Sequence, residues 1–273
     1  MPARPEASPA ATLAWLYCPP AQQDAFGALL TIEREINASL RPGLDHEVAH
    51  ARLNFWREEC ARCAGGQAAH PATRALAAAL PAQARASLAP LGGLVDLAAW
   101  DLAQAPFASR RELAGYCARW SEAFVGPLGR LGDVRPAASG ALGAALCELR
   151  LLLGAPHEAR LGRARLPLDE LGAAGASPEA LGAAQLAAPL VALLRGRHES
   201  ARGTLATGVA ALGGPEQAAL RGPLVWAALI SAASRRRVAR LPRSDPSGED
   251  RSALDALIAW RVARRAAAGR LRL

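Results

Sequence analysis

The 273-residue sequence contains no lysine, so all 32 of its basic residues other than histidine are arginines. Chemistry that needs a lysine amine, such as Schiff-base formation or phosphate binding by a P-loop, is therefore excluded. The arginines give the chain a formal net charge of +8. Because no recognised nucleic-acid-binding motif accompanies this charge, we expect no nucleic-acid partner.

The common signatures of other enzyme classes are also missing. The sequence has no GxSxG, HExxH or GxGxxG motif. Its five cysteines are an odd number, and no secretory signal precedes them, so we expect reduced thiols in a cytoplasmic protein. Cys60 and Cys63 have CxxC spacing, but no second pair completes a zinc site. They are therefore interpreted as small buried residues of a helix.

Signals for β-strands are scarce, whereas helix-forming residues are abundant. We find no run of alternating β-branched residues, and alanine, leucine and arginine dominate the composition. The pattern predicts an all-α protein of about ten helices, with one domain at 21–273 and an N-terminal segment at 1–20. The main helices are expected at 21–40, 45–63, 91–102, 110–131, 140–153, 187–212, 216–240 and 250–268, with shorter ones beginning at 71 and 81 and a further segment at 162–171.

Three segments together resemble the squalene/phytoene synthase family. The first is ARLNFWREEC at 51–60, followed by His70 and Pro71. The second is the dipeptide Tyr116-Cys117 within a long predicted helix. The third is GRARLPLDEL at 162–171. The resemblance implies an isoprenoid-synthase-like helical bundle around a central apolar cavity.

The resemblance also implies a chemistry that this chain is poorly equipped to perform. Family members join two prenyl diphosphates head to head, and Mg²⁺ held by aspartates of two facing helices neutralises the leaving diphosphate. The first aspartate cluster is expected within 25–41, and the second just before Gly162. A working cluster needs acids at i and i+4, because that spacing puts both on one helix face.

Neither expected cluster contains such a pair of acids. In the first, Glu33 and Glu35 are two residues apart and point about 200° from each other on a helix. The best register places Asn37 and Arg41 where the family has its outer aspartates. In the second, Gly154 and Glu158 occupy the aspartate positions. We therefore expect no metal site and no catalytic residues.

Other residues are candidates for a remnant of the substrate cavity. Two interpretations apply to Arg52, Trp56 and Arg57. In the first, they are part of a former diphosphate pocket. In the second, Trp56 is a core aromatic residue and the two arginines form ion pairs with Glu35, Glu58 or Glu59. Both interpretations stay open. Glu122 is expected where the long helix approaches the cavity. Burying its carboxylate against a prenyl tail would cost free energy unless the carboxylate were paired. The full set of candidate cavity residues is Glu35, Asn37, Arg41, Arg52, Trp56, Arg57, Tyr116, Glu158 and Arg163.

The leading hypothesis for function is a non-catalytic family member that binds an isoprenoid or other lipid, or acts in complex assembly with a protein partner. The resemblance extends to a branch of the family with lost aspartates, a mitochondrial complex I assembly factor. The alternative is an active prenyltransferase of squalene or phytoene synthase type, which would use Mg²⁺ as cofactor. A third hypothesis is a structural helical protein whose cavity has collapsed.

The C-terminal region adds one further alternative. Leu254, Leu257, Ile258 and Val262 recur at helical spacing among several arginines. The default interpretation of these arginines is a solvated basic face. An amphipathic helix of this kind also suits peripheral contact with the inner membrane, and we keep this as an open alternative to a purely cytoplasmic location.

Overall fold

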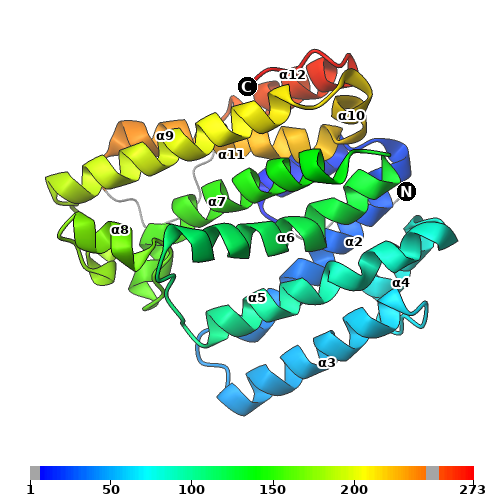
Figure 1. Cartoon of the computed structure of the whole chain (residues 1–273), viewed down its shortest axis with the longest axis horizontal. Coiled ribbons are helices and arrows are strands. Elements are labelled where there is room, and N and C mark those ends of the chain that lie inside the picture. The colour runs from blue at the N-terminus through cyan, green and yellow to red at the C-terminus, as the bar shows by residue number, and fades with distance from the viewer. Residues whose placement is uncertain (1–6, 244–251) are drawn as a thin grey trace.

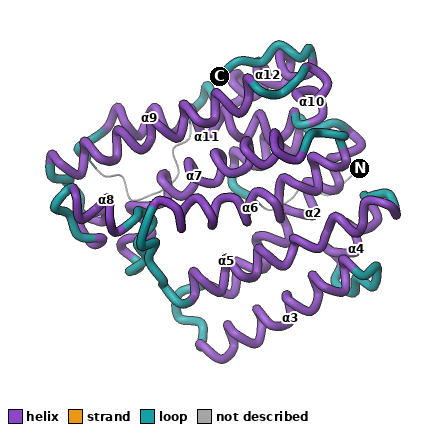
Figure 2. The backbone as a smooth tube through the Cα atoms, viewed as in Figure 1, coloured by secondary structure: helices purple, strands orange, loops and turns teal. Residues whose placement is uncertain are grey.

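The chain folds into a bundle of α-helices (Figure 1). The computed structural model describes residues 7–243 and 252–273, and within these ranges it contains helices and loops but no strand (Figure 2). The predicted all-α class is thereby confirmed. The α-helices are α1 (Pro9–Leu16), α2 (Pro20–Asn37), α3 (His46–Ala64), α4 (Pro71–Ala79), α5 (Gly93–Leu102), α6 (Arg110–Leu131), α7 (Pro136–Arg160), α8 (Leu168–Ala173), α9 (Ala188–Ala210), α10 (Gly214–Ala219), α11 (Arg221–Arg240) and α12 (Asp255–Ala267).

Three segments are 3₁₀-helices, η1 (Ala38–Leu40), η2 (Ala82–Gly92) and η3 (Pro178–Gly182). The short helix predicted to begin at residue 81 is the 3₁₀-helix η2. Helix α2 ends at Asn37, and η1 carries the chain on to Arg41, which is extended. The predicted helix 21–40 is therefore an α-helix with a tighter final turn.

Local sequence signals explain most helix starts. Proline occupies the first helical position of α2, α4 and α7, where its missing N–H has no intrahelical partner to lose. Asp45 caps α3 as predicted, because its carboxylate accepts from the backbone N–H groups of Glu47 at 2.8 Å and Val48 at 3.2 Å.

Helices α6 and α7 pack side by side in the middle of the bundle (Figure 1). α9, α11 and α12 lie on one side of this pair, and α5 and α3 lie on the other. The few aromatic residues are concentrated in the core. Phe124 stacks on Trp120 with ring centroids 4.9 Å apart and meets Phe26 and Trp226 edge-on at 5.8 and 5.6 Å.

Helix α7 is longer than the sequence pattern predicted. It spans Pro136–Arg160, whereas we expected 140–153, so four residues before the predicted start and seven after the predicted end are helical. Among the described helices, α7 alone is long and apolar enough to cross a membrane. Since 56% of its most apolar stretch is buried within the bundle, the core accounts for much of that apolar character.

The N-terminal segment 1–20 contains α1, which packs against α11 and α2. Trp15 of α1 is buried and donates through Nε1 to the backbone carbonyl of Gln23 at 3.0 Å. Residues 7–20 are thus part of the bundle.

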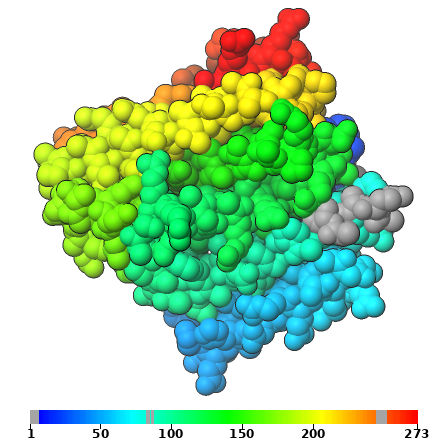
Figure 3. All heavy atoms as spheres, viewed as in Figure 1, coloured from blue at the N-terminus to red at the C-terminus, as the bar shows by residue number. Residues whose placement is uncertain are grey.

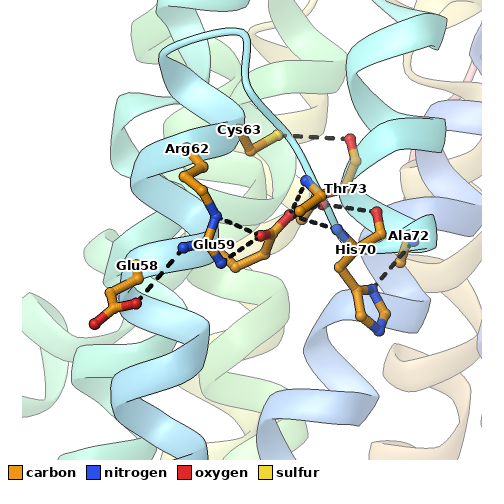
Figure 4. Close-up of polar contacts among 8 residues, drawn as sticks. Glu58, Glu59, Arg62, Cys63, His70, Ala72 and Thr73 are labelled. Atoms are coloured by element: carbon orange, nitrogen blue, oxygen red, sulfur yellow. Dashed lines mark hydrogen bonds and ion pairs between the residues drawn. The ribbon is translucent and has the colours of Figure 1, made fainter.

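Glu59 joins α3 to the start of α4 (Figure 4). Its fully buried carboxylate accepts from the backbone N–H groups of Ala69 and His70, both at 2.8 Å, from the hydroxyl of Thr73, and from Arg62. Burial alone would raise the pKa of Glu59, but these hydrogen bonds outweigh it and lower the pKa to about 2.

The cysteines behave as the sequence predicted. All five are free and buried, and Cys60 and Cys63 lie on the inner side of α3. Burial raises the pKa of Cys60 to about 12 and that of Cys63 to about 11. Neither thiol is therefore a thiolate at neutral pH, which agrees with a packing role.

Candidate functional site

A cavity of about 540 Å³ lies among α2, α5, α6 and α7. Its apolar wall comes from α2 with its following turn, from α5, from α6, and from α7 with the residue after it, and consists of Ile36, Leu40, Pro42, Leu94, Leu97, Ala98, Trp120, Cys147, Leu151 and Leu161. Its polar wall consists of Glu33, Asn37, Arg41, Asp101, Tyr116, Arg150, His157, Glu158, Arg163 and Arg165. The volume is within the range of about 300–1,000 Å³ that is typical of sites for one small ligand.

The carboxylate of Glu33 is engaged from two sides. Its Oε1 accepts a hydrogen bond from Trp120 Nε1 at 2.8 Å and another from Arg150 Nη2 at 3.0 Å. The Glu33 side chain is only 13% exposed, so the ion pair is largely removed from water. One acid of the first motif helix is therefore neutralised by an arginine of the facing helix α7.

Arg150 is held by more than this ion pair. Its guanidinium carbon lies 4.7 Å from the ring centroid of Trp120 and 4.7 Å from that of Trp226. A cation over two indole rings gains attraction from both, and the gain is larger where water is excluded. Moving Arg150 away from Glu33 would forfeit these contacts.

A second arginine neutralises Asp101 of α5. Arg165 donates through Nη1 to one oxygen of Asp101, and the hydroxyl of Tyr116 donates to the other at 3.0 Å. Both Arg165 and Asp101 are buried. Burial, and then the charge of Asp101, raise the pKa of Tyr116 well above its usual value, so this hydroxyl stays protonated and acts as a donor.

Glu158, near the end of α7, also faces arginines. Its Oε2 lies 3.0 Å from Arg165 Nη2 and 2.8 Å from Arg163 Nε. Arg165 therefore bridges Glu158 and Asp101. This network connects α5, α6, the end of α7 and the loop that follows it.

The charges of the cavity wall do not cancel. The carboxylates and arginines differ in number: the three carboxylates are Glu33, Asp101 and Glu158, and the four arginines are Arg41, Arg150, Arg163 and Arg165, so these groups leave one positive charge in excess. Arg41 is exposed, and although its backbone carbonyl accepts from the N–H of Leu44 at 3.1 Å, its side chain makes no hydrogen bond or ion pair with any residue in the described ranges. The guanidinium of Arg41 is thus available to bind an anionic group at the cavity wall.

This donor set does not fit Mg²⁺. The ion needs several oxygen ligands in near-octahedral geometry, but each cavity carboxylate already accepts hydrogen bonds from at least one arginine. Within 7–243 and 252–273, no three His, Cys, Asp or Glu side chains gather closely enough to hold a metal ion. The arginines would also repel the cation.

Five of the nine candidate residues line the cavity, namely Asn37, Arg41, Tyr116, Glu158 and Arg163. Gly154 does so as well. Asn37, Arg41, Gly154 and Glu158 therefore all line the cavity, although Asn37 and Arg41 are separated by the turn η1 rather than sharing one α-helix.

The other four candidates lie elsewhere, so their assignment to the cavity was wrong. Glu35 pairs with Arg34 at 2.7 Å, away from the cavity, because the two-residue spacing from Glu33 turns it off that face. Trp56 is buried against His70, at 4.8 Å between ring centroids. Its interpretation as a core aromatic is the one that the packing supports.

The two arginines beside Trp56 also miss the cavity. Arg57 donates to Asn54 at 3.0 Å and lies 3.7 Å from Asp96, a partner that the sequence analysis did not name. Arg52 is half-buried on α3 and does not line the cavity. Glu122 is exposed on the outer side of α6, so the expected conflict with a prenyl tail was also wrong.

Five residues of the polar wall were not among the candidate cavity residues, namely Glu33, Asp101, Arg150, His157 and Arg165. A signal for one of them existed. Arg150, Gly154 and Glu158 recur every four residues and therefore share one face of α7. The pairing of Asp101 with Arg165 bridges 64 positions, and no local pattern encodes it.

The helical bundle and its central cavity define an all-α protein of isoprenoid-synthase type. The squalene/phytoene synthase family model matches residues 5–254, and the chain therefore belongs to the squalene/phytoene synthase family. No match was found among curated proteins.

Solved structures show the same fold at low sequence identity. A dehydrosqualene synthase in complex with ligand matches with a TM-score of 0.73 and 17% identity, over 93% of this chain and 90% of that one. The squalene synthase HpnC from Alicyclobacillus acidocaldarius matches with a TM-score of 0.61 and 20% identity, over 84% of this chain and 88% of that one.

Proposed function

We propose that this chain is a non-catalytic member of its family, which binds one isoprenoid or similar lipid with an anionic head group and uses arginine in place of metal. The observation that carries the proposal is the pairing of every carboxylate on the cavity wall with an arginine. A carboxylate held this way has little remaining capacity to coordinate Mg²⁺.

The loss of metal ligands bears directly on catalysis. Ionising a prenyl diphosphate requires that charge on the leaving group be neutralised as it develops, which bound Mg²⁺ does effectively. Three of the four cavity arginines already pair with carboxylates, Arg150 with Glu33, Arg163 with Glu158 and Arg165 with Asp101. Only Arg41 among them is left to neutralise a leaving diphosphate, and one cation offsets less of that developing charge than several bound metal ions do.

The cavity is nevertheless suited to a ligand with one apolar and one anionic part. Leucine, isoleucine and alanine side chains form its apolar wall, and the unpaired Arg41 adds positive charge beside them. An apolar chain would bury surface against the first wall at roughly 25 cal/mol per Å². Its head group would accept charge-assisted hydrogen bonds from arginine.

The test is to incubate the purified protein with farnesyl or geranylgeranyl diphosphate and Mg²⁺ and to extract the products. We expect no presqualene diphosphate, squalene or phytoene above a blank without protein. Detection of any of these products would support the alternative function, an active prenyltransferase. In parallel, farnesyl monophosphate should bind in the presence of EDTA, whereas absence of binding by any farnesyl compound would favour a purely structural protein.

A further inference from the structure

Helix α12 exposes its large apolar residues and buries its small ones. Ala259, Val262, Ala263 and Ala266 face the bundle and are buried. On the opposite side, Leu254 at the N-cap is 61% exposed, Leu257 is 47% exposed and Trp260 is 45% exposed. Three of the eight large hydrophobic side chains that are exposed in the described ranges thus lie within seven residues of each other.

The same side of α12 carries arginines. Arg261, Arg264 and Arg265 are exposed, and the guanidinium of Arg264 lies 5.0 Å from the ring centroid of Trp260. We call Leu254, Leu257, Trp260, Arg261, Arg264 and Arg265 the outer face of α12. With 3.6 residues per turn, these positions fall within a single arc of the helix, so their apolar and cationic groups are interleaved rather than opposed.

The charge around this face has one sign. Residues 252–273 contain five arginines and a single acid, Asp255. Asp255 does not offset the outer face, because it pairs with Arg236 of α11 at 3.2 Å and accepts from the backbone N–H of Ser252. The helix lies at the edge of the molecule, where it forms the upper rim in Figure 3.

We propose that the outer face of α12 docks on an anionic lipid bilayer. Tryptophan is the side chain most enriched at membrane interfaces, because its ring is apolar while its N–H is polar. Arginine binds phosphate through two parallel hydrogen bonds, and its aliphatic stem packs beside leucine. A protein partner would more often be met by a patch with an apolar centre and a polar rim, which the interleaved arrangement here does not provide.

This proposal rests on α12 and is independent of what the cavity binds. The probe is a set of vesicles of phosphatidylcholine, alone or with about 30 mol % phosphatidylglycerol, with which the protein is sedimented. We expect sedimentation with the anionic vesicles and little with the neutral ones. Binding should weaken as NaCl is raised from about 0.05 to about 0.5 M, because salt screens the arginines.

Brominated lipids locate the contact. Trp260 is the one tryptophan of the six that is exposed, so quenching by bromines near the head groups should report on it. Trp260→Phe should remove most of the quenching while binding persists. The substitution of Arg261, Arg264 and Arg265 by glutamine should lower affinity by about 100-fold, at about 1 kcal/mol per arginine.

The matched control replaces Arg74, Arg111 and Arg195 by glutamine. These exposed arginines lie on α4, α6 and α9, so the control removes the same net charge from other surfaces. It should retain most of the vesicle binding. Equal loss in both triple variants, or no binding of the parent protein to anionic vesicles at low salt, would overturn the proposal. A dimer in analytical ultracentrifugation that Trp260→Ala disrupts would overturn it in favour of a second copy of the chain.

Discussion

Arg150 of α7 donates a hydrogen bond to Glu33 of α2 at 3.0 Å while its guanidinium lies over the rings of both Trp120 and Trp226, 4.7 Å from each centroid. The two charged side chains come from the two helices on which the family resemblance placed the metal-binding acids. In this chain an ion pair joins these two helices at the wall of the cavity.

The first prediction concerns the stability that this pair provides. Arg150→Gln should lower the free energy of unfolding by about 2–3 kcal/mol, because Glu33 is then left buried with only Trp120 as a donor. Chemical denaturation with urea measures the change. Arg57→Gln is the matched control, since Arg57 and Asp96 are both about half exposed and such pairs contribute about 0–1 kcal/mol. Equal effects of the two substitutions would contradict the account.

The second prediction concerns Glu59 and acid stability. Its folded-state pKa of about 2 lies below the ordinary value of 4.5, so its contribution is present above pH 4.5 and is lost as the pH falls toward 2. Glu59→Gln should cost about 2–4 kcal/mol at neutral pH and flatten the stability curve in that window. The neighbouring Glu58→Gln serves as control, because Glu58 is 73% exposed and should have almost no effect.

The third prediction concerns His198, which is buried between α9 and α11. Burial first, and then the charges of Arg202, Arg237 and Arg197, lower its pKa to about 4. Arg202 donates to Ser234 Oγ at 2.9 Å, and this leaves the serine hydroxyl free to donate to His198 Nδ1, also at 2.9 Å.

Because the folded-state pKa of His198 lies below the ordinary 6.5, the neutral form stabilises the fold above pH 6.5. That stability is lost as the pH falls toward 4. His198→Asn should remove this step while leaving the later loss due to Glu59 in place. Thermal unfolding followed at several pH values separates the two, and a step that persists in the variant would show that another group titrates.

The fourth prediction concerns recognition of the ligand head group. Arg41→Gln should weaken binding of farnesyl monophosphate about tenfold, which corresponds to one charge-assisted hydrogen bond of about 1.4 kcal/mol. Binding of farnesol should hardly change, since the apolar wall is untouched. Isothermal titration calorimetry in EDTA measures both ligands, and an equal loss for both would show that Arg41 acts on the shape of the cavity instead.

The features of the fold that the sequence predicted correctly are those set by interactions between residues close together in the chain. Helical periodicity, proline at helix starts and the cap at Asp45 are local, so the all-α fold was predictable from them. The turn η1, which separates Asn37 from Arg41, was not, because a 3₁₀ turn carries the same composition as a helix end.

The candidate site was predictable only in part. The absence of an i,i+4 acid pair could be read from the sequence itself, and the different faces of Glu33 and Glu35 followed from their spacing, which the structure confirms. That Glu33, and not Glu35, faces the cavity depends on how α2 is rotated against its neighbours. The ion pairs of Arg150 and Arg165 join distant parts of the chain and required the tertiary structure.

The fifth prediction concerns whether the lack of carboxylates is the reason that this cavity does not fit Mg²⁺. The triple substitution Asn37→Asp, Arg41→Asp, Gly154→Asp adds three acids to the cavity wall and removes one cation. Gly154 accepts a side chain without strain, since an added Cβ would meet only Glu158 Cγ at 3.9 Å. We expect this variant to gain a rise in melting temperature with millimolar Mg²⁺ and a prenyl diphosphate analogue, and the absence of any gain would show that acids alone do not make the site.

The central claim is that the cavity recognises its ligand without a metal ion. The most direct measurement is isothermal titration of the unchanged protein with the thio-substituted analogue of farnesyl diphosphate, once in EDTA and once in millimolar Mg²⁺. We predict an affinity in Mg²⁺ that is no higher than in EDTA. An increase of about tenfold or more in Mg²⁺, equivalent to about 1.4 kcal/mol, would mean that Glu33, Asp101 and Glu158 release their arginines to hold the ion, and would contradict the claim.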